Sequence, residues 1–219
     1  FIHEGLLNYL ALLGWSIAPD RDVFSLDELV AAFDIADVNP NPARFDQKKA
    51  ESINGDHIRM LDADDFAARI VPYLAGAGYI AEVPSPEQRS LIAAAAPLVQ
   101  ERVQLLGEVP GMLGFLFVDE VSYAEDALKG LPANAGEVLV ASVGALELVP
   151  EGEFTAAAVQ EALSRALVDE LGLKPRVAYG PPRVALTGRR VSPPLFESME
   201  LLGKAATLRR LDALVQHLG

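Results

Sequence analysis

The sequence predicts a mainly α-helical fold, and three observations lead to this prediction. Apolar residues recur at three- and four-residue intervals along most of the chain, which is the spacing of one helix face. Several of these runs follow a serine or an aspartate, which are typical first residues of helices. Alternating polar and apolar residues, the pattern of a half-buried strand, are scarce. With 219 residues, 51% of them hydrophobic, the chain can bury a sizeable core.

The first two predicted helices have leucine-rich faces. The first runs from Gly5 to Leu13 and stops before Gly14. Its leucines recur at helical spacing, so we expect them to be buried: Leu6, Leu7, Leu10 and Leu13. At the start of the second helix, Ser25 and Glu28 can each satisfy a free backbone amide of the first turn. Its apolar face consists of Leu26, Leu29, Val30 and Phe33.

The following helices are delimited by cap and turn residues. A third helix is predicted to end at the pair Asn54-Gly55, which favours turns. A fourth begins at Asp62, whose carboxylate can cap it, and a fifth begins after Ser85. Pro97 is expected to end the fifth helix and to precede a separate helix that carries Arg102. Later helical patterns cover residues 155–171, 196–202 and 207–218.

The sequence contains no recognisable pattern for catalysis or metal binding. Cysteine is absent, which excludes disulfides, thiolate catalysis and cysteine-ligated zinc. The patterns GxxxxGK[ST], GxSxG and HExxH are absent as well. Asp62, Asp64 and Asp65 could bind a cation, but acidic residues in a first helical turn more often interact with the helix dipole. We therefore expect no catalytic residue, metal or cofactor in this chain, and no membrane partner, because no apolar run approaches the roughly 20 residues of a spanning helix.

Charge is unevenly distributed along the chain, whose net charge is −13. Residues 174–219 contain eight basic and three acidic side chains, a net charge of +5, so residues 1–173 carry −18. Lys and Arg are the side chains that bind phosphate groups. A basic end on an acidic body fits local contact with a polyanion better than binding along the whole surface.

Three segments resemble bacterial-type glutamyl-tRNA synthetases. Residues 1–16, FIHEGLLNYLALLGWS, are similar to the family segment that follows its KMSKS-type ATP loop. Residues 45–59 contain the family's F-D-x-x-K and N-G-x-x-I-R stretches. Residues 185–204, which include ALTGRRVSPPLF and LLGK, resemble its anticodon-binding end. The three segments occur in the family's order and bracket nearly the whole chain.

This resemblance implies a mainly α fold with a helical stem-contact region at residues 1–62 and two all-α anticodon-binding subdomains at residues 63–119 and 120–219. The family's HIGH motif and KMSKS-type loop have no counterpart here. The chain is thus expected to be a C-terminal fragment of a cytoplasmic glutamate-tRNA ligase, monomeric and catalytically inactive alone. ATP and Mg would bind in the missing catalytic domain.

The resemblance also implies contacts with the anticodon bases. The residues are Arg102, Arg183, Ser192, Pro193 and Leu195. Arg102 aligns with an arginine that reads the third base, and a planar guanidinium suits base acceptors. The alternative is a surface arginine on an amphipathic helix. For the other positions, the alternative is that residues 192–194 cap the next helix and Leu195 belongs to the core.

Five further basic residues are weaker candidates for contacts with the tRNA backbone, with solvated surface charge as the alternative. They are Arg189, Arg190, Lys48, Lys49 and Arg59. Asn8, Tyr9 and Trp15 are interpreted as structural.

The leading hypothesis is recognition of tRNA(Glu) through its anticodon and stem. The sequence leaves tRNA(Gln) open as a second partner, because it does not separate discriminating from non-discriminating enzymes. The alternative is a helical protein-interaction module whose acidic surface docks an enzyme that uses glutamyl-tRNA. RNA binding weakens steeply with salt and depends on Arg102 and Arg183, whereas an acidic protein interface ignores both arginines.

Overall fold

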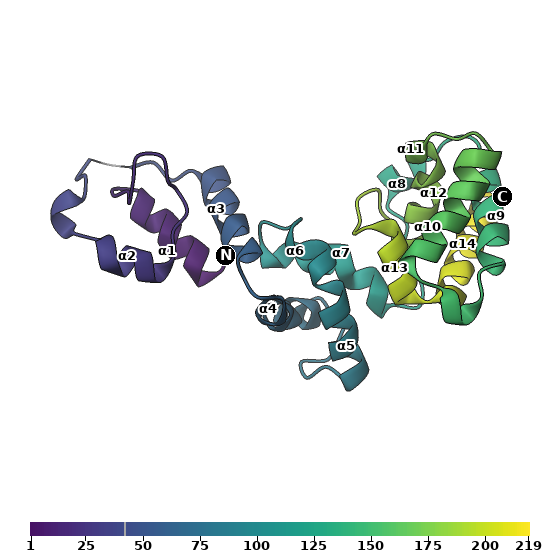
Figure 1. Cartoon of the computed structure of the whole chain (residues 1–219), viewed down its shortest axis with the longest axis horizontal. Helices are drawn as coiled ribbons and strands as arrows, with labels where there is room; N and C mark the ends of the chain where they lie inside the picture. The colour runs from purple at the N-terminus through teal and green to yellow at the C-terminus, as the bar shows by residue number, and fades with distance from the viewer. Residues whose placement is uncertain (42) are drawn as a thin grey trace. The chain divides into compact units, whose positions relative to one another are not determined.

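The computed structural model describes residues 1–41 and 43–219 and divides into two compact units, Phe1–Gly111 (unit 1) and Met112–Gly219 (unit 2) (Figure 1). Helices dominate both units, which confirms the predicted fold class. Among the described residues, extended pairing is limited to an isolated bridge between Ala18 and Arg21. The three-part division at residues 62 and 119 stays a prediction.

The helices of unit 1 are α1 (His3–Leu12), α2 (Leu26–Ala32), η1 (Ile35–Asp37), α3 (Gln47–Arg59), α4 (Ala63–Gly76), α5 (Pro86–Ala95), α6 (Pro97–Gln100) and η2 (Leu106–Glu108). Helix α7 (Val109–Leu113) spans the boundary between the units. The helices of unit 2 are η3 (Gly114–Phe117), α8 (Glu125–Lys129), α9 (Ala135–Glu147), η4 (Glu151–Glu153), α10 (Ala156–Leu163), η5 (Ser164–Glu170), α11 (Pro175–Ala178), α12 (Gly180–Thr187), α13 (Leu195–Leu202) and α14 (Lys204–Leu218).

The buried face of α1 is not the leucine face that the spacing predicts. Tyr9 packs against Ala50 and Ile53 of α3 and is 2% exposed. Its hydroxyl accepts a hydrogen bond from the backbone N–H of Asp46 at 2.5 Å. The leucines at positions 6, 7 and 10 are instead 37–46% exposed. Helical spacing identifies an apolar face, but the face that contacts α3 is the one that carries Tyr9. In this orientation the Tyr9 ring is packed against α3 and its hydroxyl is hydrogen-bonded.

The predicted turn at Asn54-Gly55 is wrong, because α3 continues to Arg59. Asn54 is fully buried and joins three segments of unit 1. Its Oδ1 accepts from the N–H of Ile2 at 2.8 Å, and its Nδ2 donates to the carbonyl of Gln104 at 2.5 Å. Helix α1 crosses closely at Gly5, where a Cβ would lie 2.7 Å from the Cα of Asn54. Tertiary hydrogen bonds thus override the local turn preference.

Most of the predicted helix starts are confirmed. Ser25 and Ser85 each form a complete capping box, and Pro97 begins a separate helix, α6. Asp62 occupies the cap position of α4, but its carboxylate makes no cap hydrogen bond. The apolar face predicted for α2 stays largely open: Leu26, Val30 and Phe33 are 46%, 74% and 45% exposed.

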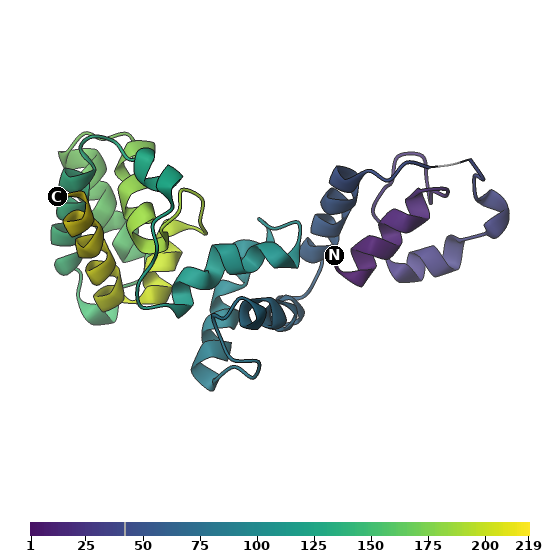
Figure 2. The ribbon, with the colours of Figure 1, turned by 180° about the vertical axis from the view of Figure 1, so that it is seen from behind.

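Unit 2 has its own core, built from the apolar faces of its longer helices. Helix α9 packs on α14, α10 packs on α13, and α12 contacts both α9 and α14 (Figures 1 and 2). The helix predicted over residues 155–171 is present as α10 followed by η5, a π-helical stretch. The core residues include Val138, Leu139, Leu163, Met199 and Leu211.

A buried arginine ties the first residues of unit 2 to its helices. Arg210 of α14 is 5% exposed. Its Nη1 donates to the carbonyl of Leu186 at 2.7 Å, and its Nη2 donates to the carbonyls of Phe115 and Val118 at 2.8 and 2.5 Å. Its Nε is buried without a hydrogen-bond partner. Burial lowers the pKa of Arg210 from its usual value.

A polar network in unit 1 is centred on His57 and Asn8. The Nε2–H of His57 donates to Asn8 Oδ1 at 2.8 Å, since that oxygen can only accept. The same oxygen accepts from the N–H of Phe24 at 3.1 Å, and Asn8 Nδ2 donates to the carbonyl of Asp22 at 2.8 Å. Trp15 lies edge-on to Phe24 at 5.7 Å. The structural interpretation of Asn8, Tyr9 and Trp15 agrees with their burial.

We expect unit 1 to lose stability as the pH falls below about 6.5. Burial lowers the pKa of His57 below its ordinary value of 6.5, so the unfolded chain takes up the proton before the folded chain does. Urea unfolding at pH 7.5 and 5.5, followed by the fluorescence of Trp15, measures this loss. His57→Gln should flatten the pH dependence, whereas His3→Gln, at an exposed histidine, should not. Equal pH dependence in wild type and His57→Gln would contradict the assignment.

Candidate functional site

Arg183 holds the loop between α12 and α13 and thereby connects three of the predicted site residues. It lies half-buried on α12. Its Nη1 donates to the hydroxyl of Ser192 at 2.6 Å and to the carbonyl of Pro193 at 3.0 Å. The Ser192 hydroxyl donates in turn to the same carbonyl at 2.9 Å. The arginine therefore fixes the course of this loop from a rigid helix.

The loop is also anchored where it leaves α12. Gly188 ends the helix in the left-handed conformation, with φ of 70°. Its carbonyl accepts from the N–H of Ala124 at 2.8 Å. The Thr187 hydroxyl donates to the carbonyl of Arg183 at 2.9 Å and accepts from the N–H of Arg189 at 3.2 Å. Residues 189–194 thus run between two fixed ends.

Of the loop-end residues, Leu195 matches the core alternative. It begins α13, is 4% exposed and belongs to the hydrophobic core of unit 2. Ser192 and Pro193 are buried as well, but the cap position of α13 is Pro194 and no side chain caps the helix. Ser192 therefore acts within the loop through Arg183, and the helix-capping alternative for it is wrong.

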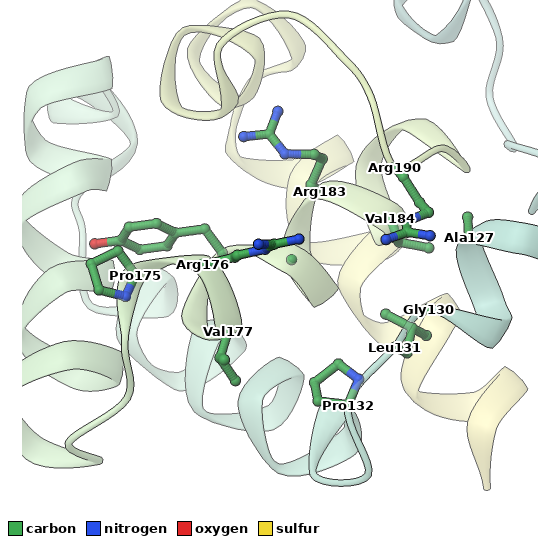
Figure 3. A pocket seen from close by; sticks show the side chains of 12 residues that line it. Ala127, Gly130, Leu131, Pro132, Pro175, Arg176, Val177, Arg183, Val184 and Arg190 are labelled. Atoms are coloured by element: carbon green, nitrogen blue, oxygen red, sulfur yellow. The ribbon is translucent and has the colours of Figure 1, made fainter.

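A pocket of about 610 Å³ lies beside Arg183 and is lined by three arginines (Figure 3). The other two are Arg176 of α11 and Arg190 of the loop, and both are exposed. Among the described residues no acidic side chain lines the pocket, and the remaining walls are largely apolar, including Leu131 and Tyr179. In Figure 3 the guanidinium groups of Arg176 and Arg190 face one another, whereas that of Arg183 points away from them. The pocket can attract an anion and cover an apolar group.

Arg102 belongs to unit 1 and lies outside a helix. Helix α6 ends at Gln100, and Arg102 follows in an exposed turn, with its N–H donating to the carbonyl of Val99 at 2.8 Å. The prediction that a helix carries Arg102 is therefore wrong. Buried Val103 next to it fixes the turn. Within the described part of the chain, the Arg102 side chain has no hydrogen bond or ion pair, so its guanidinium is available to a ligand.

The weaker basic candidates fall into two groups. Lys49 pairs with Asp22 at 2.9 Å, and Arg59 pairs with Asp56 at 2.6 Å. The exposed group without such a pair, in the part of the chain that the structure describes, consists of Lys48, Arg189 and Arg190. Surface ion pairs contribute about 0–1 kcal/mol to stability, so Lys49 and Arg59 could exchange their carboxylate partners for a phosphate group.

The sequence reasoning missed Arg176 and Tyr179 as site residues. Arg176 was counted in the basic C-terminal stretch, but nothing in its local pattern distinguished it from a solvated arginine. Pro175 begins the short helix α11, and both Pro175 and Arg176 line the pocket. Tyr179 is fixed edge-on against Phe196 at 5.2 Å. Only the fold brings these residues together.

A second groove, of about 570 Å³, is acidic rather than basic. It is lined by small apolar residues of α9 and α10 and by Glu153, Glu161 and Glu170. Of the described residues that line it, Arg165 alone is basic, and it pairs with Glu161 at 2.5 Å. This groove is unsuited to phosphate. Across the described residues no cluster of metal-binding side chains occurs, and no described helix has the length and apolarity needed to cross a membrane.

Comparison with known proteins identifies the family. The family described as "Anticodon binding domain" matches residues 65–215. The glutamate–tRNA ligase of Leifsonia xyli subsp. xyli is 66% identical over 221 residues, which are all of this chain and 45% of that protein. The glutamate–tRNA ligase of Clavibacter sepedonicus is 60% identical over all of this chain and 44% of its own length. The chain thus spans less than half the length of these curated relatives.

Solved structures support the fold. The crystal structure of a glutamate tRNA ligase from Elizabethkingia meningosepticum in complex with its amino acid aligns with a TM-score of 0.79 at 24% identity. The alignment covers 99% of this chain and 41% of that one. The glutamate-tRNA synthetase of Elizabethkingia anophelis aligns with a TM-score of 0.78 at 23% identity. With the family match over residues 65–215, the chain belongs to the anticodon-binding domain family.

Proposed function

We propose that this chain recognises tRNA(Glu), reading its anticodon with unit 2 and the turn at Arg102 and touching its stem with residues 1–62. Bases of single-stranded RNA loops are splayed out and read by hydrogen bonding and stacking. Arg102 and Arg183 supply planar donors for this purpose. Leu195 contributes by fixing the start of α13 beneath the loop.

The observation that carries this proposal is the pair of hydrogen bonds from Arg183 to the Ser192 hydroxyl and the Pro193 carbonyl, beside the arginine-lined pocket. These hydrogen bonds hold the loop next to a cationic pocket that no described acidic side chain lines, inside an otherwise acidic chain. RNA would be guided to this place and repelled elsewhere.

The whole protein, by this proposal, is a cytoplasmic glutamate–tRNA ligase that attaches glutamate to tRNA with ATP and Mg. Those cofactors would bind outside the residues of this chain. The chain alone, acting as a monomer, would bind tRNA without aminoacylating it. Whether it also accepts tRNA(Gln) depends on how strictly Arg102 selects the third anticodon base.

Titration with labelled tRNA(Glu) and its anticodon variants at several salt concentrations tests this function. Wild type should prefer tRNA(Glu), and its affinity should fall steeply with salt. Arg102→Ala should lose the preference at the third base, worth about 1–3 kcal/mol for a lost base contact, while still binding.

The control variant is Arg165→Ala, which removes an equal charge from the acidic groove. It should leave base preference unchanged. Equal affinity of the wild-type chain for an unrelated tRNA would overturn the proposed function. Loss of affinity without loss of base preference in Arg102→Ala would reassign Arg102 to the RNA backbone.

The acidic groove favours a second candidate function, the docking of an enzyme that uses glutamyl-tRNA. Its small apolar residues and its three glutamates suit a basic amphipathic helix of such a partner. Leu148, which lines the groove, is 85% exposed and adds apolar surface that such a helix would cover. Binding of that enzyme would ignore Arg102→Ala and Arg183→Ala, so the same variants separate the two functions.

A further inference from the structure

We propose that the pocket between α8, α11 and α12 is a subsite for one phosphodiester group of RNA, held between Arg176 and Arg190. This inference rests on the proposed function and adds to it Arg176 and a binding mode. The phosphate would enter between the two guanidinium groups that face one another in Figure 3.

The first argument is that both arginines are unpaired. Within the described residues neither Arg176 nor Arg190 makes a side-chain hydrogen bond or an ion pair. Surface arginines in this chain commonly do find an acid: Arg21, Arg59, Arg69 and Arg165 all pair. Two cations that line one pocket without an acid repel each other and leave a site that an anion would stabilise.

The second argument is that the two arginines belong to different elements that meet at the pocket. Arg176 lies on α11, which begins with Pro175 and is followed directly by α12. The Arg190 guanidinium lies against Gly130, where a Cβ would come within 3.1 Å of its Cζ and Nε. Gly130 thus leaves room for this side chain. Two guanidinium groups from different elements can bind one phosphate through several charge-assisted hydrogen bonds.

The third argument concerns the rest of the pocket, which suits a nucleotide rather than a bare ion. Val177, Leu131 and Tyr179 give it apolar walls, and its volume of about 610 Å³ exceeds that of a phosphate group. The loop of Ser192 and Pro193 is tied to Arg183, which also lines the pocket. A strand of RNA read by that loop would therefore pass its backbone over Arg176 and Arg190.

The experiment uses the chain with a synthetic anticodon stem-loop of tRNA(Glu). Affinities of wild type, Arg176→Ala, Arg190→Ala and the double variant are measured against salt. Each single variant should weaken binding by about 5- to 10-fold at low salt, and the double variant, which leaves the phosphate without a cation, should lower the salt slope by about 0.7. Because both arginines hold one phosphate, the double variant should lose less than the product of the two single losses.

Arg209→Ala is the matched control, since it removes an exposed arginine of the same unit that does not line the pocket. It should change affinity much less. Stem-loops with a single neutral methylphosphonate identify the phosphate: one position should weaken wild type but not the double variant. If the Arg176 and Arg190 variants bound RNA as tightly as Arg209→Ala, the phosphate subsite would be overturned. The proposed function would still stand in that case if the wild-type chain preferred tRNA(Glu). Pocket binding of inorganic phosphate without any effect of the variants on RNA affinity would overturn the assignment to RNA.

Discussion

Arg210→Ala is expected to destabilise unit 2 by about 2–4 kcal/mol. The substitution leaves the carbonyls of Leu186, Phe115 and Val118 without their donor, and an unsatisfied buried acceptor costs about 1–3 kcal/mol. The substitution also removes the desolvation cost of a buried charge that no carboxylate in the described residues pairs with, which offsets part of this loss. Arg210→Lys keeps the charge but lacks the two separate guanidinium nitrogens that reach the three carbonyls, so it should recover little of the stability.

Urea unfolding followed by far-UV circular dichroism measures the loss. Trp15 is the single tryptophan and lies in unit 1, so its fluorescence provides an internal reference that should change less. Arg209→Ala removes the neighbouring exposed arginine and should lie within about 0.5 kcal/mol of wild type. If Arg210→Ala and Arg209→Ala unfolded at the same urea concentration, the hydrogen bonds of Arg210 would carry no net stability.

The helices were predictable where their signals are local. The capping boxes at Ser25 and Ser85 and the break at Pro97 depend on neighbouring residues only, and all three are confirmed. Asn54-Gly55 was misread because its preference for turns loses to hydrogen bonds with residues about 50 positions away. The face of α1 was misread for a similar reason, since burial of Tyr9 depends on α3. Local propensity thus fails where distant partners set the energy.

The candidate site was predictable only in part. Family resemblance selected Arg183, Ser192 and Pro193, and the structure places them in direct contact. It also selected Leu195, whose side chain is in the core. Arg176 was not predictable as a site residue, because the sequence does not show that it lines the same pocket as Arg190. A charge count locates a basic region, but only a fold shows which charges face a shared pocket.

Gly188→Ala is expected to have a second large effect, destabilising unit 2 by about 2–4 kcal/mol and weakening RNA binding. Gly188 has φ of 70°, a conformation that costs other residues about 1–2 kcal/mol. A Cβ would also lie 2.1 Å from the carbonyl oxygen of Ser122, so the backbone has to shift. Overpacking of this kind costs about 1–3 kcal/mol. The shift would displace the loop that carries Arg189, Arg190 and Ser192.

Gly172→Ala separates the two causes. Gly172 has φ of 65°, but a Cβ there meets nothing within 4 Å. It should therefore show the backbone cost alone, about 1–2 kcal/mol, with RNA affinity preserved. Unfolding curves and tRNA titrations of both variants measure the difference. If the two variants were equally stable, the close approach to Ser122 would be relieved at no cost. If Gly188→Ala lost stability but bound tRNA like wild type, the position of residues 189–194 would not govern recognition, because RNA would then reorder the loop on binding.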